Sequence, residues 1–471
     1  MDVRYTSYEA LLGAVTDPDG RPVHDPASGD LVGCAAVRSI DDLDDAVRRA
    51  RSAQPAWAAR SDEERVELLL RAAEAIEASA EALAELLCRE QGKPLNGPNA
   101  RFEVGACAGW LRATAATPLP GGAVLDDEET HAEIHYRPVG VVGAIGPWNW
   151  PMMITIWQVA PSLRMGNTVV VKPSEYTPLS VLALGQVLNS VLPDDVVTVV
   201  AGDGDLGAHL TTHPDIGKLM FTGSTRTGKD IARASASTLK RLTLELGGND
   251  AGIVLPDVDP EAIAEGLFWG AFINTGQTCA ALKRLYVHTD VYDEVCAALV
   301  EVGRQMPMGP GLEEQNVLGP LQNKAQYDIV AGLVDAAVGA GAKVLLGGDP
   351  VADSPGFFYP TTLVAEIGND NPLVAEEQFG PALPIVRYSD VEDAVAMANG
   401  LDFGLGASVW SDDPAAARAV AARLEAGTVW INSHGGVHPM IPFGGIKGSG
   451  YGLEFGTEGL KSVSVPQVIN G

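Results

Sequence analysis

The chain has 471 residues, of which 46% are apolar and 20% charged, with 53 glycines and 31 prolines. At about 150 residues per domain this length predicts roughly two to four domains, and the composition excludes wholesale disorder and a collagen-like fibre. Acidic residues outnumber basic ones by 61 to 32, a formal net charge of −29. No basic stripe interrupts this acidity, so we expect no nucleic-acid partner.

The N-terminal segment, Met1 to Gly20, has no basic region followed by an apolar core, so no signal peptide is predicted. Gly140 to Leu163 holds no charged residue, but prolines interrupt it and we expect no membrane span. The five cysteines are widely spaced and none forms a CxxC pair. This pattern predicts a reducing cytoplasmic location, with neither disulfides nor a metal site.

Residues 61–91 predict a helix, because apolar side chains recur there mostly at three- and four-residue steps. Ser61 and Glu64 form a capping box at its start, and Gly92 and Pro94 end it. Short β-branched runs then alternate with helical stretches, which is typical of parallel strands joined by crossover helices in a doubly wound sheet. The predicted strands are Val141–Ile145, Thr168–Lys172, Val196–Val200, Lys218–Thr222 and Ile253–Leu255.

The alternation begins again after Pro256, with a predicted helix near 260–274 and a strand at Leu282–His288. We therefore place a domain boundary near residue 248, in the pair Gly247–Gly248, and predict an α/β architecture on both sides of it.

Two glycine-rich loops are similar to nucleotide-binding motifs. Residues 202–207 match GxGxxG, but the next strand ends without the acidic residue that the dinucleotide fingerprint requires. Residues 223–230 are close to a P-loop, but Asp230 replaces the hydroxyl that would hold Mg²⁺. A P-loop-like NTPase that uses Gly223 to Lys229 is therefore kept as an alternative function, in a different class of enzyme.

Three residues have the properties of catalytic groups. Cys279 follows small and polar residues, where a thiol can face a cleft and act as a nucleophile. Glu245 lies in an apolar, strand-like run, where burial would raise its pKa toward that of a general base. Asn149 stands among two prolines and two tryptophans, which would fix its amide in a dry site suited to an oxyanion. Taken singly, each also fits a structural role: an inert loop thiol, an outward-facing acid or a turn amide.

These three residues belong to a series of blocks that resembles the aldehyde dehydrogenase superfamily, in order and spacing, over nearly the whole chain. The blocks are Gln91–Pro94, Pro147–Pro151, Lys172–Glu175, Phe221–Thr225, Leu244–Gly248, Gly276–Cys279, Glu377–Pro381 and Pro442–Gly445. The resemblance implies two doubly wound α/β domains with a small β oligomerisation extension. It divides the chain into an NAD-binding domain (1–119 and 138–247), a catalytic domain (248–448) and an oligomerisation element (120–137 and 449–471).

The resemblance also implies a reaction, the NAD(P)-dependent oxidation of an aldehyde to its carboxylic acid. Cys279 would attack the aldehyde to give a thiohemiacetal and then a thioester, with the oxyanion held by the Asn149 amide and the Cys279 backbone N–H. Glu245 would activate the water that hydrolyses the thioester. Relatives that acylate coenzyme A generally lack this glutamate, so Glu245 favours hydrolysis, with the acylating reaction kept as an alternative. The intact residues argue against a non-catalytic, lens-type relative.

By the same resemblance the cofactor is NAD, with NADP as a second candidate. Lys172 and Glu175 would hold the adenosine ribose, where a carboxylate repels a 2′-phosphate. Gly223 and Ser224 would contact the pyrophosphate at a helix N-terminus. The remaining implied cofactor contacts are Trp148, Ser174, Gly204, Gly207, Leu246, Glu377 and Phe379.

An apolar substrate pocket is expected from the side chains that line the aldehyde tunnel in relatives. They are Trp150, Met153, Trp157, Val437 and Phe443, and they indicate a hydrophobic substrate, a medium-chain aliphatic or aryl aldehyde. The expected partners are this small molecule and further copies of the chain, as a homodimer or homotetramer, without a membrane. The 120–137 half of the oligomerisation element alternates apolar and polar residues as a half-buried strand does. Pro466 interrupts the other half, which leaves that half in doubt.

Overall fold

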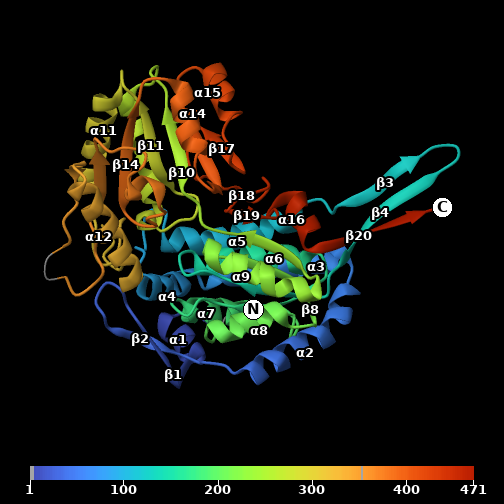
Figure 1. The fold of residues 1–471 in the computed structure, drawn as a ribbon. Helices are drawn as coiled ribbons and strands as arrows, with labels where there is room; N and C mark the ends of the chain where they lie inside the picture. The colour runs from blue at the N-terminus through green and yellow to red at the C-terminus, as the bar shows by residue number, and fades with distance from the viewer. Residues whose placement is uncertain (1–4, 352–353) are drawn as a thin grey trace.

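The computed structural model describes residues 5–351 and 354–471, which form two α/β units and a projecting arm (Figure 1). The first unit contains a six-stranded sheet of order β19-β9-β8-β5-β6-β7, in which only β19 is antiparallel. Its strands are β5 (Val141–Ile145), β6 (Thr168–Lys172), β7 (Val197–Val199), β8 (Ile216–Thr222), β9 (Arg241–Glu245) and β19 (Gly450–Tyr451). The predicted doubly wound sheet is confirmed, and β5 and β6 have the predicted bounds.

Both faces of this sheet are covered, because its central strands are apolar throughout and alternate side chains point to opposite faces. In β5, Val142 and Ala144 join one buried cluster while Val141 and Ile145 join another. The first cluster includes residues of α1 (Tyr8–Val15), α3 (Asp62–Ala78), α4 (Ala80–Gln91), α5 (Ala100–Ala116), α6 (Pro151–Arg164) and α7 (Pro178–Asn189). The second includes residues of α2 (Ile40–Ala58), α8 (Gly204–Thr212) and α9 (Thr225–Ser235).

The single helix predicted over 61–91 is wrong, because Ser79 divides it into α3 and α4. The Ser79 N–H donates to the Ile76 carbonyl at 3.1 Å, a tight last turn that ends α3. The predicted capping box of Ser61 and Glu64 is confirmed, and Gly92 ends α4 in the left-handed conformation, with φ of 92°.

The second unit contains a seven-stranded sheet of order β12-β13-β14-β11-β10-β16-β17, in which only β12 is antiparallel. Its strands are β10 (Asp250–Val254), β11 (Leu282–His288), β12 (Lys343–Leu346), β13 (Thr362–Ala365), β14 (Ala382–Tyr388), β16 (Gly406–Trp410) and β17 (Thr428–Ile431). On one face pack α10 (Pro260–Phe272) and α11 (Tyr292–Gln305). On the other pack α12 (Lys324–Gly339), α13 (Pro372–Ala375), α14 (Val391–Asn399) and α15 (Pro414–Ala421).

The projecting arm is an antiparallel sheet of order β20-β4-β3, formed by β3 (Gly121–Asp126), β4 (His131–Pro138) and β20 (Ser464–Asn470) (Figure 1). Both halves of the predicted extension are therefore present. The expectation that Pro466 interrupts the second half is wrong. β20 pairs with β4 over its whole length, with Pro466 opposite Tyr136. Proline is tolerated there because β20 is an edge strand, so a residue without an N–H need not interrupt the ladder.

Smaller elements complete the chain: the hairpin of β1 (Thr16–His24) and β2 (Leu31–Ala35), β15 (Phe403–Gly404), β18 (Ile446–Lys447), α16 (Gly456–Ser462), and the 3₁₀ turns Ala236–Thr238 and Ile273–Gly276. In the described part of the chain, none of the helices has the length and apolar character that a bilayer crossing requires. The domain boundaries derived from the resemblance stay a prediction.

Candidate active site

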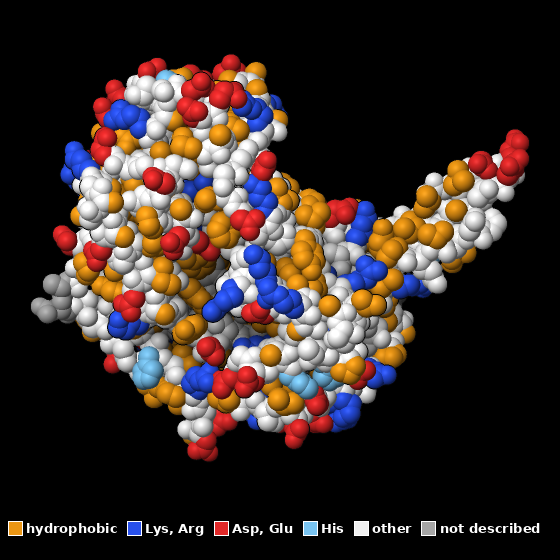
Figure 2. Space-filling view, viewed as in Figure 1, with side chains coloured by type: hydrophobic (Ala, Val, Ile, Leu, Met, Phe, Trp, Pro, Cys, Tyr) orange, Lys and Arg blue, Asp and Glu red, His pale blue; other side chains and the backbone are white. Residues whose placement is uncertain are grey.

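A cleft of about 700 Å³ lies at the carboxyl ends of the first sheet's parallel strands, and the face in Figure 2 is hollowed between the two units. Four strands deliver their last residue to it, namely Ile145, Lys172, Thr222 and Glu245. This edge is where open α/β sheets bind ligands, because the loops leave the strands there and helix N-termini point toward it. All three predicted catalytic residues and all predicted cofactor-binding residues line this cleft.

The backbone that carries Cys279 is held in an unusual conformation. Asn274, Thr275 and Gly276 have φ values of 51°, 56° and 76°, so three successive residues are left-handed. At Gly276 a Cβ would collide with the carbonyl oxygen of Gly380, so only glycine fits there. Such strain persists only where the surroundings enforce it, and it commonly marks functional sites.

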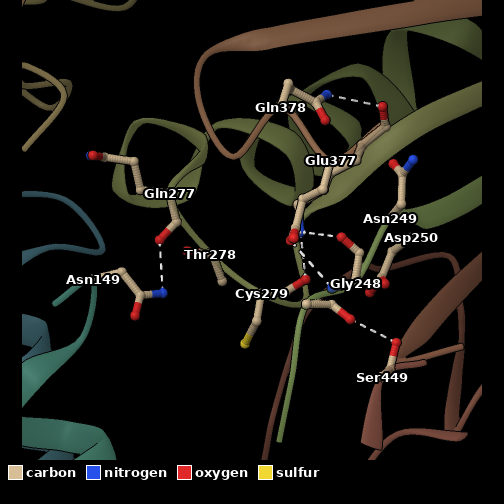
Figure 3. A network of polar contacts seen from close by, with 12 residues as sticks. Asn149, Gly248, Asn249, Asp250, Gln277, Thr278, Cys279, Glu377, Gln378 and Ser449 are labelled. Carbon is tan, nitrogen blue, oxygen red and sulfur yellow. Dashed lines mark hydrogen bonds and ion pairs between the residues drawn. The ribbon is translucent and has the colours of Figure 1, made fainter. Parts of the chain in front are cut away.

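The segment around Cys279 is fixed by hydrogen bonds from both units (Figure 3). The Trp150 indole N–H donates to the Thr278 hydroxyl at 2.9 Å, and Lys283 Nζ donates to the Cys279 carbonyl at 2.7 Å. The thiol itself is half-buried and lines the cleft. Burial raises the pKa of Cys279 well above its usual value, the charge of Glu245 raises it further, and Lys283 opposes both. The free protein therefore holds this group as a thiol at neutral pH.

Glu245 is the last residue of β9 and its side chain is buried at the cleft wall. Neither carboxyl oxygen has a hydrogen-bond partner among residues 5–351 and 354–471. Burial raises its pKa to about 8, against the effect of the Cys279 thiol, which lowers it. An unpartnered carboxyl at such a position costs folding energy, and a carboxyl with this pKa has the properties of a general base.

Asn149 lies beside the Cys279 segment, with its side chain 3% exposed. Its amide Nδ2 donates to the carbonyl of Gln277 at 2.9 Å, as Figure 3 shows. An amide nitrogen carries two hydrogens, so one N–H remains for another acceptor. The backbone carbonyl of Asn149 in turn accepts from Asn274 Nδ2 at 2.9 Å. The amide is thereby tied to the loop that carries the thiol.

A buried ion pair not predicted from the sequence, Lys93 with Glu103, holds the backbone carbonyl of Asn149. Lys93 Nζ lies 2.5 Å from Glu103 Oε2 and donates to the Asn149 carbonyl at 2.7 Å. Glu103 Oε1 accepts the N–H groups of Met152 and Met153, at 2.9 and 3.1 Å, in the first turn of α6. Both charged side chains are fully buried. The pair therefore joins α5, α6 and the Asn149 turn. The sequence signals for it are a lysine in the block Gln91–Pro94 and an acid in a largely apolar helix.

The predicted cofactor residues are spread along the cleft. Lys172 ends β6, three strands along the sheet from Glu245 at the end of β9, whereas Glu377 is linked to the Cys279 carbonyl through Lys283. Between them α9 begins after Ser224, whose hydroxyl accepts the Thr227 N–H, leaving other first-turn N–H groups without helical partners. A third residue not predicted from the sequence, Lys283, lies 2.7 Å from Glu377 and so links this carboxylate to the Cys279 carbonyl.

The predicted substrate-pocket residues do not line this cleft. Trp150, Met153, Trp157 and Phe443 are buried in the large apolar cluster of the first unit, against which Cys279 and Val437 pack. Trp157 contacts Trp110 and Phe455 edge to face or tilted, with ring centroids 5.5 and 4.8 Å apart. The structure thus brings them to the apolar side of the Cys279 segment, and their contact with a substrate stays a prediction.

Comparison with known proteins identifies the chain's relatives. Residues 15–469 match the aldehyde dehydrogenase family. The phenylacetaldehyde dehydrogenase of Pseudomonas fluorescens is 39% identical over 93% of this chain and 90% of its own. PnpE of Pseudomonas sp. WBC-3, solved in complex with nicotinamide adenine dinucleotide, is 37% identical, with a TM-score of 0.92 over 96% of this chain and 93% of that one.

An E. coli enzyme described as NADP-dependent has 33% identity and a TM-score of 0.93, over 96% of this chain and 94% of its own. The match spans nearly the whole chain in sequence and in fold, and it agrees with a cleft that gathers a thiol, a carboxyl and an amide. The chain belongs to the aldehyde dehydrogenase family.

Proposed function

We propose that the protein oxidises a hydrophobic aldehyde, medium-chain aliphatic or aryl, to its carboxylic acid with NAD as the cofactor. The observation that carries the proposal is that Cys279, Glu245 and Asn149 meet in the same cleft as the predicted cofactor residues. The phenylacetaldehyde dehydrogenase relative supports an aryl substrate. The apolar cluster beside Cys279 supports a substrate without charge.

The cleft suits a dinucleotide in size and chemistry. Its volume of about 700 Å³ falls within the range of small-molecule and cofactor sites. Lys172 and Glu175 would hold the adenosine ribose, the first turn of α9 would hold the pyrophosphate, and Glu377 with Phe379 would hold the nicotinamide end. When bound, the nicotinamide supplies the acceptor for the hydride that leaves the aldehyde carbon.

Cys279, Asn149 and Glu245 would carry out the bond-forming and hydrolytic steps. The sulfur of Cys279 bonds to the carbonyl carbon while the thiol proton passes to solvent water, and the Asn149 amide would donate its free N–H to the resulting oxyanion. After oxidation the acyl group is a thioester on Cys279. Glu245 takes a proton from a water that attacks this carbon, the C–S bond breaks, the departing sulfur of Cys279 regains this proton, and the carboxylic acid leaves. Transfer to coenzyme A needs no such base, so Glu245 supports hydrolysis.

The test is to follow NADH and NADPH formation over a panel of aliphatic and aryl aldehydes, each with NAD and NADP in turn. Oxidation of hydrophobic aldehydes to free acids is expected, with charged aldehydes as poor substrates. Inactivity with every aldehyde would overturn the proposal, and a strict requirement for coenzyme A would replace it with the acylating reaction.

Turnover should rise with pH, reach half its maximum near pH 8 and level off about one pH unit higher. A carboxyl with a pKa of about 8 is mostly protonated at neutral pH and accepts a proton only after ionisation, so the active fraction grows as the pH increases. The measurement is kcat at saturating aldehyde and NAD across the pH range. The rise should be absent from the residual activity of Glu245→Gln, and a flat or falling wild-type profile would contradict the assignment.

We infer that the arm formed by β3, β4 and β20 binds a second copy of the chain, as a homodimer or homotetramer. The arm extends away from both units, and apolar side chains follow it in Figure 2. Val124, Val468 and Ile469 are 64%, 61% and 53% exposed on it. Exposed apolar strands of this kind are normally covered by a partner.

A further inference from the structure

A second cavity, of about 630 Å³, adjoins the cleft behind Glu175. Glu175 and Tyr176 line both spaces, so they form the wall between them. The second cavity is also lined by three basic side chains, Arg21, His24 and Lys324. Neither the proposed reaction nor the predicted cofactor contacts use these groups. In a chain with 32 basic and 61 acidic residues, three basic side chains in one cavity call for an explanation.

Arg21 is the cation that reaches the wall. Its Nη1 lies 3.5 Å from Glu175 Oε2, and its Nη2 is hydrogen-bonded to Asp203. The guanidinium comes from β1, where Arg21 pairs with Ala35 of β2, so its backbone is fixed by the hairpin. Arg21 and Glu175 are 36% and 44% exposed, so both side chains lie partly in solvent.

The charges at this end of the cleft balance. Glu175 and Asp203 are two carboxylates, and Lys172 and Arg21 are two cations near them. Burial lowers the pKa of Lys172, while Glu175 and Asp203 raise it. A lone carboxylate beside the ribose would repel a 2′-phosphate. Here the guanidinium offsets that repulsion, and its planar fork of donors matches a phosphate.

We propose that Arg21, which lines the cavity behind Glu175 and contacts that carboxylate, binds the 2′-phosphate of NADP, so that the chain accepts NADP as well as NAD. The proposal rests on the function proposed above, since it requires the adenosine ribose to lie at Glu175. With NAD, Glu175 accepts from the ribose hydroxyls. With NADP, Glu175 turns aside and Arg21 exchanges a carboxylate for the phosphate.

The test compares two fragments that differ only in the 2′-phosphate, adenosine 2′,5′-bisphosphate and 5′-AMP. Calorimetry would give the affinity of each for the wild type, Arg21→Gln and Arg21→Lys. We expect Arg21→Gln to lower the affinity for the bisphosphate by about tenfold or more, the factor that one charge-assisted hydrogen bond supplies. The affinity for 5′-AMP should stay within about twofold of the wild-type value. Arg21→Lys should lose less affinity for the bisphosphate, because lysine keeps the positive charge but lacks the planar set of guanidinium donors. The kcat/KM for NADP should fall in parallel, with that for NAD unchanged.

The matched control is Arg51→Gln. Arg51 is also paired with an aspartate, Asp215, but lines neither cavity, so both fragments should bind this variant as they bind the wild type. An equal loss of both fragments in Arg21→Gln, or no loss of either, would overturn the proposal and leave the dinucleotide site standing. A wild type that binds neither fragment would instead overturn the dinucleotide site and the proposed function with it.

Discussion

Replacing Cys279 with alanine is expected to lower aldehyde turnover by about 10⁴-fold or more, the scale of loss when an enzyme's nucleophile is removed. The reason is that the thiol is the group in the cleft able to form and release a thioester, since Glu245 serves as the base and Asn149 as a donor. The measurement is NADH formation with the best aldehyde of the panel, together with the mass of the intact protein after reaction with aldehyde and NAD. The wild type should carry an acyl group transiently, and the variant none.

The control for this variant is Cys34→Ala. Cys34 is half-buried in β2, away from the cleft, and its loss should leave turnover within about twofold, as expected for a site without contact to the chemistry. Thermal unfolding of both variants would show that the fold is intact. Undiminished turnover in Cys279→Ala would remove this residue as nucleophile, and with it the proposed reaction.

Much of the fold was predictable because each strand carries a local signal. The β-branched runs at β5 and β6 are short, largely apolar and bounded by turns, and their bounds match the prediction. The break between α3 and α4 was not predictable, because serine inside an apolar helical pattern is compatible with both a continuous and a divided helix. The pairing of β20 with β4 joins residues far apart in the chain, and no local pattern encodes which edge a strand with a proline will occupy.

The candidate active site also contains both residues that the sequence predicted and residues that it did not. Cys279, Glu245 and Asn149 stand out because each residue type conflicts with its sequence surroundings, and the structure gathers them in one cleft. Lys93, Glu103 and Lys283 are also charged residues, but besides their ion pairs they bond to backbone groups of other segments. Such partners have no sequence signature. The contact of the predicted pocket residues with a substrate stays a prediction, because it depends on how large apolar side chains pack rather than on their identity.

Replacing Glu245 with glutamine should separate the two halves of the reaction. The amide fills the same space but cannot accept a proton from water, so thioester hydrolysis should slow by about 10²- to 10⁴-fold, the range that a general base contributes. Acylation should proceed, because Cys279 and Asn149 remain. We expect a burst of NADH close to one equivalent per site, followed by slow turnover, and a stable acyl adduct on Cys279 in the intact mass.

Glu454→Gln is the matched control for this variant. Glu454 is also a fully buried carboxyl with a pKa raised by burial, to about 7, and it does not line the cleft. If the loss in Glu245→Gln came merely from disturbing a buried acid, both variants would slow alike and neither would accumulate the adduct. A burst and an adduct in Glu245→Gln alone assign the base to Glu245, because only a specific block after acylation leaves the thioester in place. Unchanged turnover in Glu245→Gln would exclude that role and favour an acceptor other than water, such as coenzyme A, for the acyl group.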